Sequence, residues 1–418
     1  MKIEIVTIGD ELLLGLTIDT NAAWIARELA AVGVEIRWRT TVRDDAEDIA
    51  AAVSEAIERT GAVITTGGLG PTADDKTKGA IAALFGRALH RDEAIVDGMK
   101  ERWARLKRPG SFPESNIAQA MIPEGAVILD NRHGTAPGIW LEDERARWVA
   151  MLPGVPREMR GLFADELFER IARLAETDGS REVIRSRTLR TTGIAESALA
   201  DQLGELSRSV DGMGVAFLPG VEGVDLRVTS RGRSPEAADS TLQSAMLKLR
   251  AAAGRYVIGE GEDDLAAVVL DMSRRRGIRI AVAESCTGGM LGARLTAVPG
   301  SSDVFAGGVI AYDNSVKREL LGVSDPELDE HGAVSEQVAA TMARSVRTQL
   351  GTDIGIAITG VAGPGGGTAS KPVGMVWVAI DGIDTRAVCI RLFGTREEVR
   401  QRAAQAALDM VRRALETS

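Results

Sequence analysis

The feature that most restricts the fold of this chain is a regular alternation of strand-like and helix-like segments in its N-terminal part. β-Branched segments are present at 3–8, 34–38 and 62–66, and apolar residues recur at helical spacing in 21–32 and 45–58. The first and third strand-like segments end in glycine, at Gly9 and Gly67. Because parallel strands need a crossover between them, this β-α-β-α-β order predicts a three-layer α/β domain, with a largely parallel sheet between helices.

The remainder of the chain predicts two further domains. A polar break at 176–180 has the composition of a linker. A small α+β unit follows, with strands at 187–191 and 224–228 and helices at 196–206 and 237–252. A third unit, again α/β, has strands at 278–283, 304–312, 354–359 and 376–380 and helices at 265–275 and 396–415. We therefore predict domains at 1–172, 180–255 and 260–418.

Composition limits the partners, the metals and the location. A net charge of −10 disfavours general binding to nucleic acid. Two cysteines and three unclustered histidines exclude a disulfide framework and a Cys/His metal site, so a metal would need oxygen ligands, as Mg2+ prefers. The N-terminus lacks the apolar region of a signal peptide, and no segment has the length of a membrane span. We expect a cytoplasmic protein with no membrane partner.

The segment 280–289, Ile-Ala-Val-Ala-Glu-Ser-Cys-Thr-Gly-Gly, predicts a strand, a tight turn and the start of a helix. Ser285 and Thr287 would then lie where a helix leaves backbone N–H groups unpaired, a natural site for an anion or an oxyanion. Gly288 and Gly289 would let a ligand approach the backbone closely. Ser285 is a candidate nucleophile. The alternative is that Ser285 only caps the helix.

A second segment, Tyr312-Asp-Asn-Ser-Val-Lys317, follows the next apolar strand. A lysine can take the proton of a serine when its pKa is lowered by burial, and the Ser–Lys pair is a variant of the catalytic triad. The alternative is that Lys317 is a solvated surface lysine.

A third segment, at 358–367, places five glycines after another strand, where backbone amides can bind phosphate or an oxyanion. Its candidate residues are Thr359, Gly360 and Gly363. Arg396, at the start of the final helix, can pair with a phosphate. The alternatives are a flexible loop and an ordinary helix-surface arginine.

Together these segments resemble the C-terminal domain of the CinA family, which is of the PncC type of nicotinamide mononucleotide deamidase. The motifs that carry the resemblance are Ala283–Gly289, Tyr312–Lys317, His331–Ser335, Thr359–Pro364 and Lys371–Gly374. The resemblance implies hydrolysis of nicotinamide mononucleotide to nicotinate mononucleotide and ammonia, without a cofactor. Ser285 would be the nucleophile and Lys317 its base, and Tyr312 would hold or relay the proton. Substrate contacts would come from Thr287, Gly288, Gly289, Thr359, Gly360, Gly363 and Arg396.

A glycine-rich stretch at 65–75 also follows a strand and opens a helix. The amides of Gly67, Gly68 and Gly70 can bind phosphate there, although the pattern is neither a Walker A loop nor GxGxxG. Asp74 and Asp75 beside a phosphate favour a bridging Mg2+. The alternative is that these acids only favour the helix N-terminus.

The stretch 1–170 resembles the molybdopterin-binding-like (MogA/MoaB-like) domain of the CinA family. That resemblance implies a metal-dependent ADP-ribose pyrophosphatase that produces AMP and ribose 5-phosphate, with Asp75 at the divalent metal. Asn21 and Asn116 suit ribose or base contacts, or are caps. The candidate nucleotide-binding residues are Glu11, Asn21, Gly67, Gly68, Gly70, Thr72, Asp74 and Asn116.

In the middle unit, Gly220-Val-Glu-Gly223 has the GxxG spacing of a KH loop, but its apolar and acidic content predicts a turn rather than a phosphate clamp. The unit resembles the KH-like linker domain of the CinA family, which implies a spacer or a dimer contact and hence a homodimer. Together these resemblances imply a pyridine-nucleotide recycling hydrolase. The alternatives are a molybdopterin-binding protein and a non-enzymatic adaptor in DNA uptake or recombination.

Overall fold

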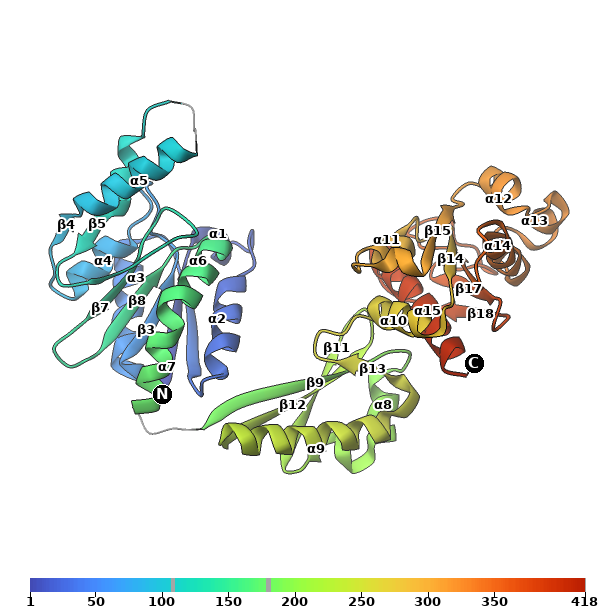
Figure 1. Ribbon diagram of the computed structural model, residues 1–418, viewed down its shortest axis with the longest axis horizontal. Helices are drawn as coiled ribbons and strands as arrows, with labels where there is room; N and C mark the ends of the chain where they lie inside the picture. The colour runs from blue at the N-terminus through green and yellow to red at the C-terminus, as the bar shows by residue number, and fades with distance from the viewer. Residues whose placement is uncertain (107–109, 178–181, 418) are drawn as a thin grey trace. The chain divides into compact units, whose positions relative to one another are not determined.

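The computed structural model describes residues 1–106, 110–177 and 182–417 (Figure 1). The chain divides into two compact units. One comprises Met1–Arg185 with Ser230–Thr241, and the other comprises Ser186–Thr229 with the chain from Leu242 on. Within the residues described, no helix combines the length and the hydropathy that a membrane span requires.

The N-terminal domain is built on a six-stranded sheet in the order β2-β1-β3-β8-β7-β6. The strands are β1 (Lys2–Ile8), β2 (Glu35–Val42), β3 (Ala62–Thr66), β6 (Val127–Leu129), β7 (Gly138–Glu142) and β8 (Trp148–Leu152). β2, β1, β3 and β8 pair with one another in parallel, whereas β7 pairs antiparallel with both β8 and β6. The predicted largely parallel sheet is therefore confirmed.

Helices cover both faces of this sheet, as predicted. One face packs against α2 (Thr20–Ala30), α6 (Pro156–Leu162) and α7 (Phe168–Thr177). The other packs against α3 (Ala46–Thr60) and α4 (Thr77–Leu84). Local sequence defines these helices: Asp45 caps α3 by accepting from the amides of Glu47 and Asp48, and Gly61 ends it in the left-handed conformation.

Three details differ from the sequence prediction. Strand β2 continues to Val42, beyond the predicted end at 38, because its polar residues lie on an edge strand that is only partly covered. A short helix, α1 (Asp10–Leu13), follows β1. The predicted linker at 176–180 begins later than expected, since Glu176 and Thr177 end α7. The other residues of that prediction, 178–180, lie outside the described part of the chain.

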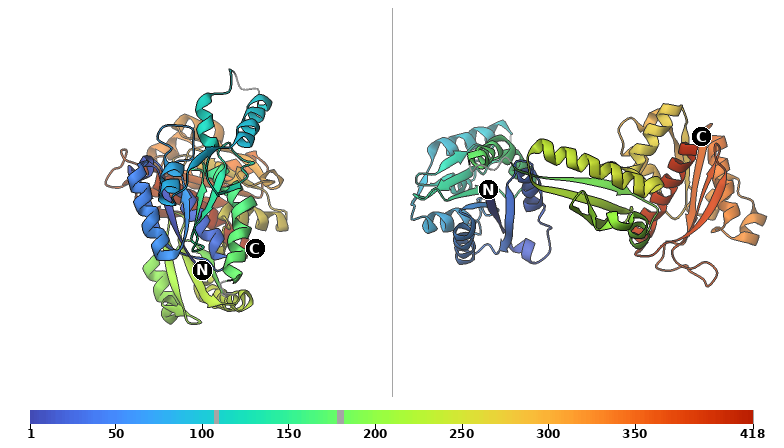
Figure 2. Two further views of the ribbon diagram at one scale, coloured as in Figure 1. Left: turned by 90° about the vertical axis from the view of Figure 1, so that its left-hand side faces the viewer. Right: turned by 90° about the horizontal axis from the view of Figure 1, so that it is seen from below.

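The middle domain is a five-stranded sheet in the order β10-β11-β12-β9-β13. Its strands are β9 (Val183–Thr191), β10 (Ser209–Val210), β11 (Met213–Pro219), β12 (Val224–Arg233) and β13 (Val257–Glu260). Helix α8 (Glu196–Leu203) and the part of α9 (Pro235–Ala253) from Leu242 on supply the core that packs on this sheet (Figure 2). Gly220 and Gly223 form the predicted turn, with the Gly220 amide donating to the Gly223 carbonyl at 2.8 Å.

The C-terminal domain has a five-stranded sheet in the order β15-β14-β16-β17-β18. The strands are β14 (Ile280–Glu284), β15 (Phe305–Ile310), β16 (Ile354–Gly360), β17 (Met375–Asp381) and β18 (Arg386–Arg391). β14 pairs in parallel with β15 and β16, and the other pairings are antiparallel. The predicted strand at 304–312 ends two residues early, because helix α12 (Asn314–Leu321), capped by Asp313, follows it closely.

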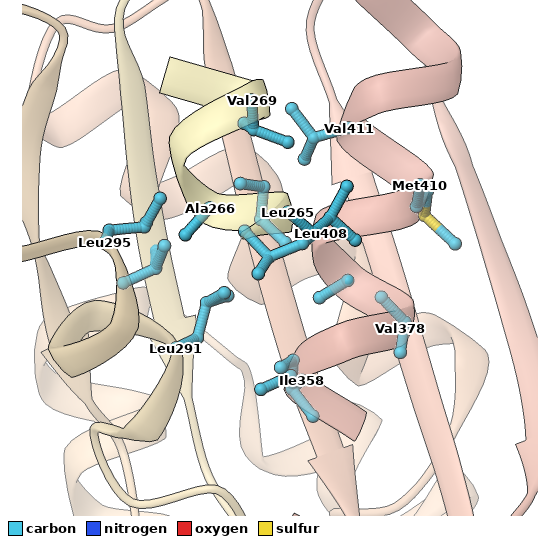
Figure 3. Packing of buried hydrophobic residues seen from close by; sticks show 14 of the residues in the cluster. Leu265, Ala266, Val269, Leu291, Leu295, Ile358, Val378, Leu408, Met410 and Val411 are labelled. Atoms are coloured by element: carbon cyan, nitrogen blue, oxygen red, sulfur yellow. The ribbon is translucent and has the colours of Figure 1, made fainter. Parts of the chain in front are cut away.

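Two apolar cores hold this sheet between helices. On one face, α10 (Leu265–Arg276), α11 (Met290–Thr296) and α15 (Arg396–Thr417) pack together, and Leu265, Leu291 and Leu408 meet between them (Figure 3). On the other face lies α14 (Glu336–Gln349). Since β14, β15 and β16 are parallel, their carboxyl ends meet at one edge of the sheet.

Candidate functional site

The three C-terminal motifs converge on that edge. Glu284, the last residue of β14, pairs with Ile310 of β15 and with Ile358 of β16. Ser285 follows immediately, and its amide donates to the Ile358 carbonyl at 2.9 Å. The polar groups after three strands are thereby brought to one place, as expected for ligand sites of parallel sheets.

Lys317 is a buried lysine, with 1% of its surface exposed, so it is not a solvated surface residue. Its Nζ donates to the carbonyls of Ala311 at 2.8 Å and Tyr312 at 3.3 Å. The Ala311 amide in turn donates to the carbonyl of Glu284 at 2.7 Å, so the residue that holds the amine is bonded to the strand end that precedes Ser285. Burial lowers the pKa of Lys317, opposed by the negative charge of Asp313. This shift favours the neutral amine that a general base requires.

Ser285 does not cap the following helix. The N-cap of α11 is Gly289, and no side chain caps that helix. The Ser285 side chain is 8% exposed, and its Oγ has no hydrogen-bond partner within the described residues, Lys317 Nζ included. A nucleophile and its base are often further apart before the substrate binds.

Glu284 is a site residue that sequence reasoning missed. Its carboxylate is 1% exposed and accepts from three backbone amides, Gly289 at 3.0 Å, Leu291 at 3.0 Å and Gly292 at 2.8 Å. These charge-assisted bonds, together with the start of α11, compensate the buried charge. The available signal was a single acid at the last position of an otherwise apolar strand.

Several backbone amides at the helix start already have acceptors. The Gly289 amide is bound by Glu284, and the Gly288 amide donates to the Ser285 carbonyl, so neither is free for an oxyanion. Among the described residues, no acceptor is found for the Thr287 amide. The Thr287 hydroxyl is also buried without a partner. Thr287 is therefore the residue beside Ser285 that can meet a developing negative charge.

Cys286 lies next to Ser285 but is unsuited to nucleophilic attack. Burial raises the pKa of its thiol to about 11, although the nearby Arg396 and Arg400 act in the opposite direction. A thiol with this pKa is protonated at neutral pH and is a poor nucleophile.

Arg396 connects two of the predicted segments and is not an ordinary helix-surface arginine. Its Nη2 donates to Tyr312 Oη, and its Nη1 donates to the Gly363 carbonyl, both at 2.6 Å. The Tyr312 hydroxyl is thus bound to Arg396 rather than to Lys317. Arg400, which sequence reasoning missed, donates to the Thr287 carbonyl at 3.2 Å and 2.8 Å.

Two other predicted substrate contacts have structural partners. Thr359 Oγ1 donates to the Ala333 carbonyl at 2.7 Å and is 1% exposed. Gly360 lies so close to β17 that a Cβ there would be 2.8 Å from the Met375 carbonyl oxygen. Thr359 therefore has little surface for a ligand, and both residues help to form the edge of the site.

The glycine-rich stretch of the N-terminal domain is held together by Asp75. Its Oδ1 accepts from the Gly70 amide at 2.7 Å, and its Oδ2 accepts from the Thr72 amide at 2.8 Å and from the Thr72 hydroxyl. The Gly67 amide donates to Leu152. Of the three amides predicted to bind phosphate, only that of Gly68 has no acceptor among the described residues.

Asn21 and Asn116 differ in their settings. Asn21 is 8% exposed; its amide donates to the Gly154 carbonyl at 2.7 Å, whereas its Oδ1 is buried without a partner. Asn21 is not a cap, because the N-cap of α2 is Asp19, whose side chain accepts from the Ala22 amide. Asn116 lies in the 3-10 helix Glu114–Ala120, which Lys78 holds by donating to the Ala118 carbonyl. Burial lowers the pKa of Lys78 to about 8.

The predicted metal residue fits poorly. Three hydrogen bonds occupy most of the acceptor positions of Asp75. Across residues 1–106, 110–177 and 182–417, no group of three or more acidic, histidine or cysteine side chains is arranged to hold a metal ion. Acidic groups do gather nearby: burial raises the pKa of Asp44, and the charges of Glu11, Asp10 and Asp74 raise it further.

Three family models match successive parts of the chain. They are "Probable molybdopterin binding domain" over 4–173, "Damage-inducible protein CinA KH domain" over 186–259 and "CinA C-terminal domain" over 262–415. The three models together cover the three domains of the chain.

Similar proteins span the whole chain. A "CinA-like protein" of Gemmatimonas aurantiaca is 61% identical over 416 residues, which cover 99% of this chain and 96% of that protein. A "CinA-like protein" of Gloeobacter violaceus is 45% identical and covers 98% of this chain and 96% of its own. A solved structure, that of "the protein CinA with unknown function" from Thermoplasma acidophilum, is 33% identical in sequence. It covers 41% of this chain and 97% of that one, with a TM-score of 0.37. The chain belongs to the CinA family.

Proposed function

We propose that the C-terminal domain hydrolyses the carboxamide of nicotinamide mononucleotide, with Ser285 as nucleophile and Lys317 as base. The observation that carries the proposal is the buried Lys317, whose pKa is lowered and whose amine is bonded to Ala311, the residue that is itself bonded to the strand end before Ser285. Neutral lysine is the form that can accept the serine proton.

In the proposed reaction, Lys317 takes the proton of Ser285 while Oγ bonds to the carboxamide carbon. The oxygen of the carboxamide becomes negative and is met by the unpartnered amide and hydroxyl of Thr287. The C–N bond then breaks, and Lys317 returns the proton to the leaving nitrogen, which departs as ammonia. Water, deprotonated by the same lysine, releases nicotinate mononucleotide and restores Ser285.

The phosphate of the substrate has candidate partners on α15. Arg396 and Arg400 both reach the site, and each uses part of its guanidinium to hold a backbone carbonyl. Since an arginine has five N–H donors, donors remain for a phosphate oxygen. Tyr312, bound to Arg396, would orient the substrate rather than relay the proton directly.

The test is ammonia release from nicotinamide mononucleotide by the full chain, without added metal. Ser285→Ala and Lys317→Met should each lose activity by at least ~100-fold, as expected for the loss of a nucleophile or of a general base. Ser302→Ala and Arg318→Ala, which alter exposed residues of the same domain, should retain it. No release by the unaltered protein would reject the proposal.

For the N-terminal domain we propose metal-dependent hydrolysis of ADP-ribose to AMP and ribose 5-phosphate. Support comes from the unpartnered Oδ1 of Asn21, a buried acceptor next to the glycine-rich stretch, and from the free amide of Gly68. The proposed metal is Mg2+. The charges of Glu11, Asp10 and Asp74 act on Asp44 nearby, and Asp75 holds the loop rather than the metal.

This second activity is tested by AMP release from ADP-ribose with Mg2+. Asp74→Asn should reduce it, whereas Ser285→Ala should leave it unchanged because that residue lies in the other unit. Retention of a pterin with no reaction on ADP-ribose would favour the molybdopterin-binding alternative. Salt-dependent DNA binding would favour the adaptor. The homodimer also remains a prediction, and the mass in solution tests it.

A further inference from the structure

A cavity of about 780 Å³ lies in the second unit and includes none of the residues of the Ser285–Lys317 site. Its walls are two segments of the middle domain, 192–195 and 220–224, together with parts of β17, β18 and α15. The volume falls in the range of small-molecule binding sites, roughly 300–1,000 Å³. Neither of the proposed activities uses this cavity.

The walls are joined by specific contacts. Gln405 of α15 is 3% exposed; its Nε2 donates to Thr192 Oγ1 at 3.1 Å, and its Oε1 accepts from Arg294 at 2.7 Å. Gly193 packs so tightly on α15 that a Cβ there would lie 2.9 Å from the guanidinium of Arg413. The part of the cavity wall that comes from the middle domain is therefore held against α15 of the C-terminal domain.

The lining carries an excess of positive charge. It contains two carboxylates, Glu222 and Asp409, and four guanidinium groups, those of Arg386, Arg391, Arg402 and Arg413. Both carboxylates are already in ion pairs. Glu222 lies 3.1 Å from Arg190 and 3.2 Å from Arg294, and Asp409 lies 2.6 Å from Arg412.

Two of the arginines form no ion pair among the described residues, although the charge of Arg402 acts on Glu398, whose pKa is lowered first by hydrogen bonds from Thr395 and further by this arginine. Within the part of the chain that the structure describes, Arg391 and Arg402 form no ion pair, and Arg402 donates only to the Phe393 carbonyl at 3.0 Å. In a chain whose net charge is −10, this local excess attracts an anion. A guanidinium with free donors binds carboxylate, sulfonate or phosphate oxygens well.

The rest of the lining is apolar. Val388 and Ile390 lie on β18, Val378 lies on β17, and Met410 lies on α15. Figure 3 shows Val378 and Met410 on the side of α15 that faces away from Leu291 and Leu295. A pocket with an apolar surface and two unpaired arginines suits a ligand with an apolar body and an anionic group.

We propose that this cavity binds a small organic anion, an aromatic or aliphatic body that carries a carboxylate, sulfonate or phosphate. Arg391 and Arg402 would bind the anionic group, and Ile390 and Met410 would contact the body. Since the walls come from both the middle and the C-terminal domain, bound ligand stabilises the contact between them.

The test is a fluorescence titration of the full chain with 8-anilinonaphthalene-1-sulfonate, an aromatic sulfonate. The double variant Arg391→Gln/Arg402→Gln should raise the Kd at least tenfold. Ala406→Trp, which fills the cavity from α15, should abolish binding. The control Arg275→Gln/Arg276→Gln removes the same charge from an exposed part of α10 and should leave the Kd unchanged.

An equal Kd in the two double variants would overturn the proposal, because the dye would then bind elsewhere. A second result would also overturn it. If a cavity variant lost dye binding and its mass in light scattering also changed, the cavity would be a contact between copies of the chain. If Ala406→Trp does not fold, as judged by circular dichroism, the two charge variants decide the result.

Discussion

Replacing Glu284 by glutamine tests whether this carboxylate organises the turn that carries Ser285. The carboxylate accepts three amides, two on Oε2 and one on Oε1. Glutamine offers one oxygen, so its NH2 group must face at least one backbone N–H that has no other acceptor. An unsatisfied buried donor costs about 1–3 kcal/mol, and the two remaining bonds lose their ionic character at about 1 kcal/mol each.

The free energy of unfolding should therefore fall by about 4 kcal/mol. The fall is somewhat smaller than the sum because the variant no longer buries a charge. For a domain of this size, 1 kcal/mol shifts the melting temperature by roughly 2–4 °C, so the shift should be about 10 °C. Calorimetry of the full chain measures it, and the transition of the C-terminal part should be the one that moves. Ammonia release at a temperature where the variant is folded should also fall, because Thr287 and Ser285 lose their fixed geometry.

Glu336→Gln, an exposed acid in the first turn of α14, is the matched control and should change the melting temperature by less than ~2 °C. An unchanged melting temperature in Glu284→Gln would refute the reasoning. Lowered stability with full activity in the folded variant would mean that Glu284 holds the fold but does not position the site.

Three further predictions follow from titration and burial. Because burial lowers the pKa of Lys317 below its usual 10.5, kcat/KM for ammonia release should rise with pH through that pKa and then level off, and a flat profile would argue against a lysine base. Burial lowers the pKa of Lys78 to about 8, so between about pH 8 and 10.5 the unfolded chain binds more protons than the folded one. The stability of the unaltered protein relative to Lys78→Met should therefore rise with pH across that range. Thermal melts at several pH values measure this difference. With a thiol reagent at pH 7, the exposed Cys389 should react and the buried Cys286 should not, so that one thiol is counted in the native protein and two in denaturant.

Much of the fold could be predicted from local pattern. The strands that end in glycine and the capped helices of the N-terminal domain were placed within a few residues, since periodicity and capping are encoded in neighbouring residues. The boundaries that were misplaced, at β2 and β15, depend on pairing and on the next helix, which are not local.

For the site, the sequence by itself determined which residue types follow which strands: Ser285 after one, Lys317 after the next and a glycine-rich stretch after a third. It left open whether Ser285 was a cap and whether Lys317 was solvated. Only the tertiary structure decided these points, because burial and hydrogen-bond partners depend on segments far apart in the chain. The same holds for Asp75, whose sequence position suited a metal but whose oxygens accept the amides of Gly70 and Thr72. The type of each side chain is given by its position in the sequence, whereas its partners depend on the tertiary fold, which brings distant segments together.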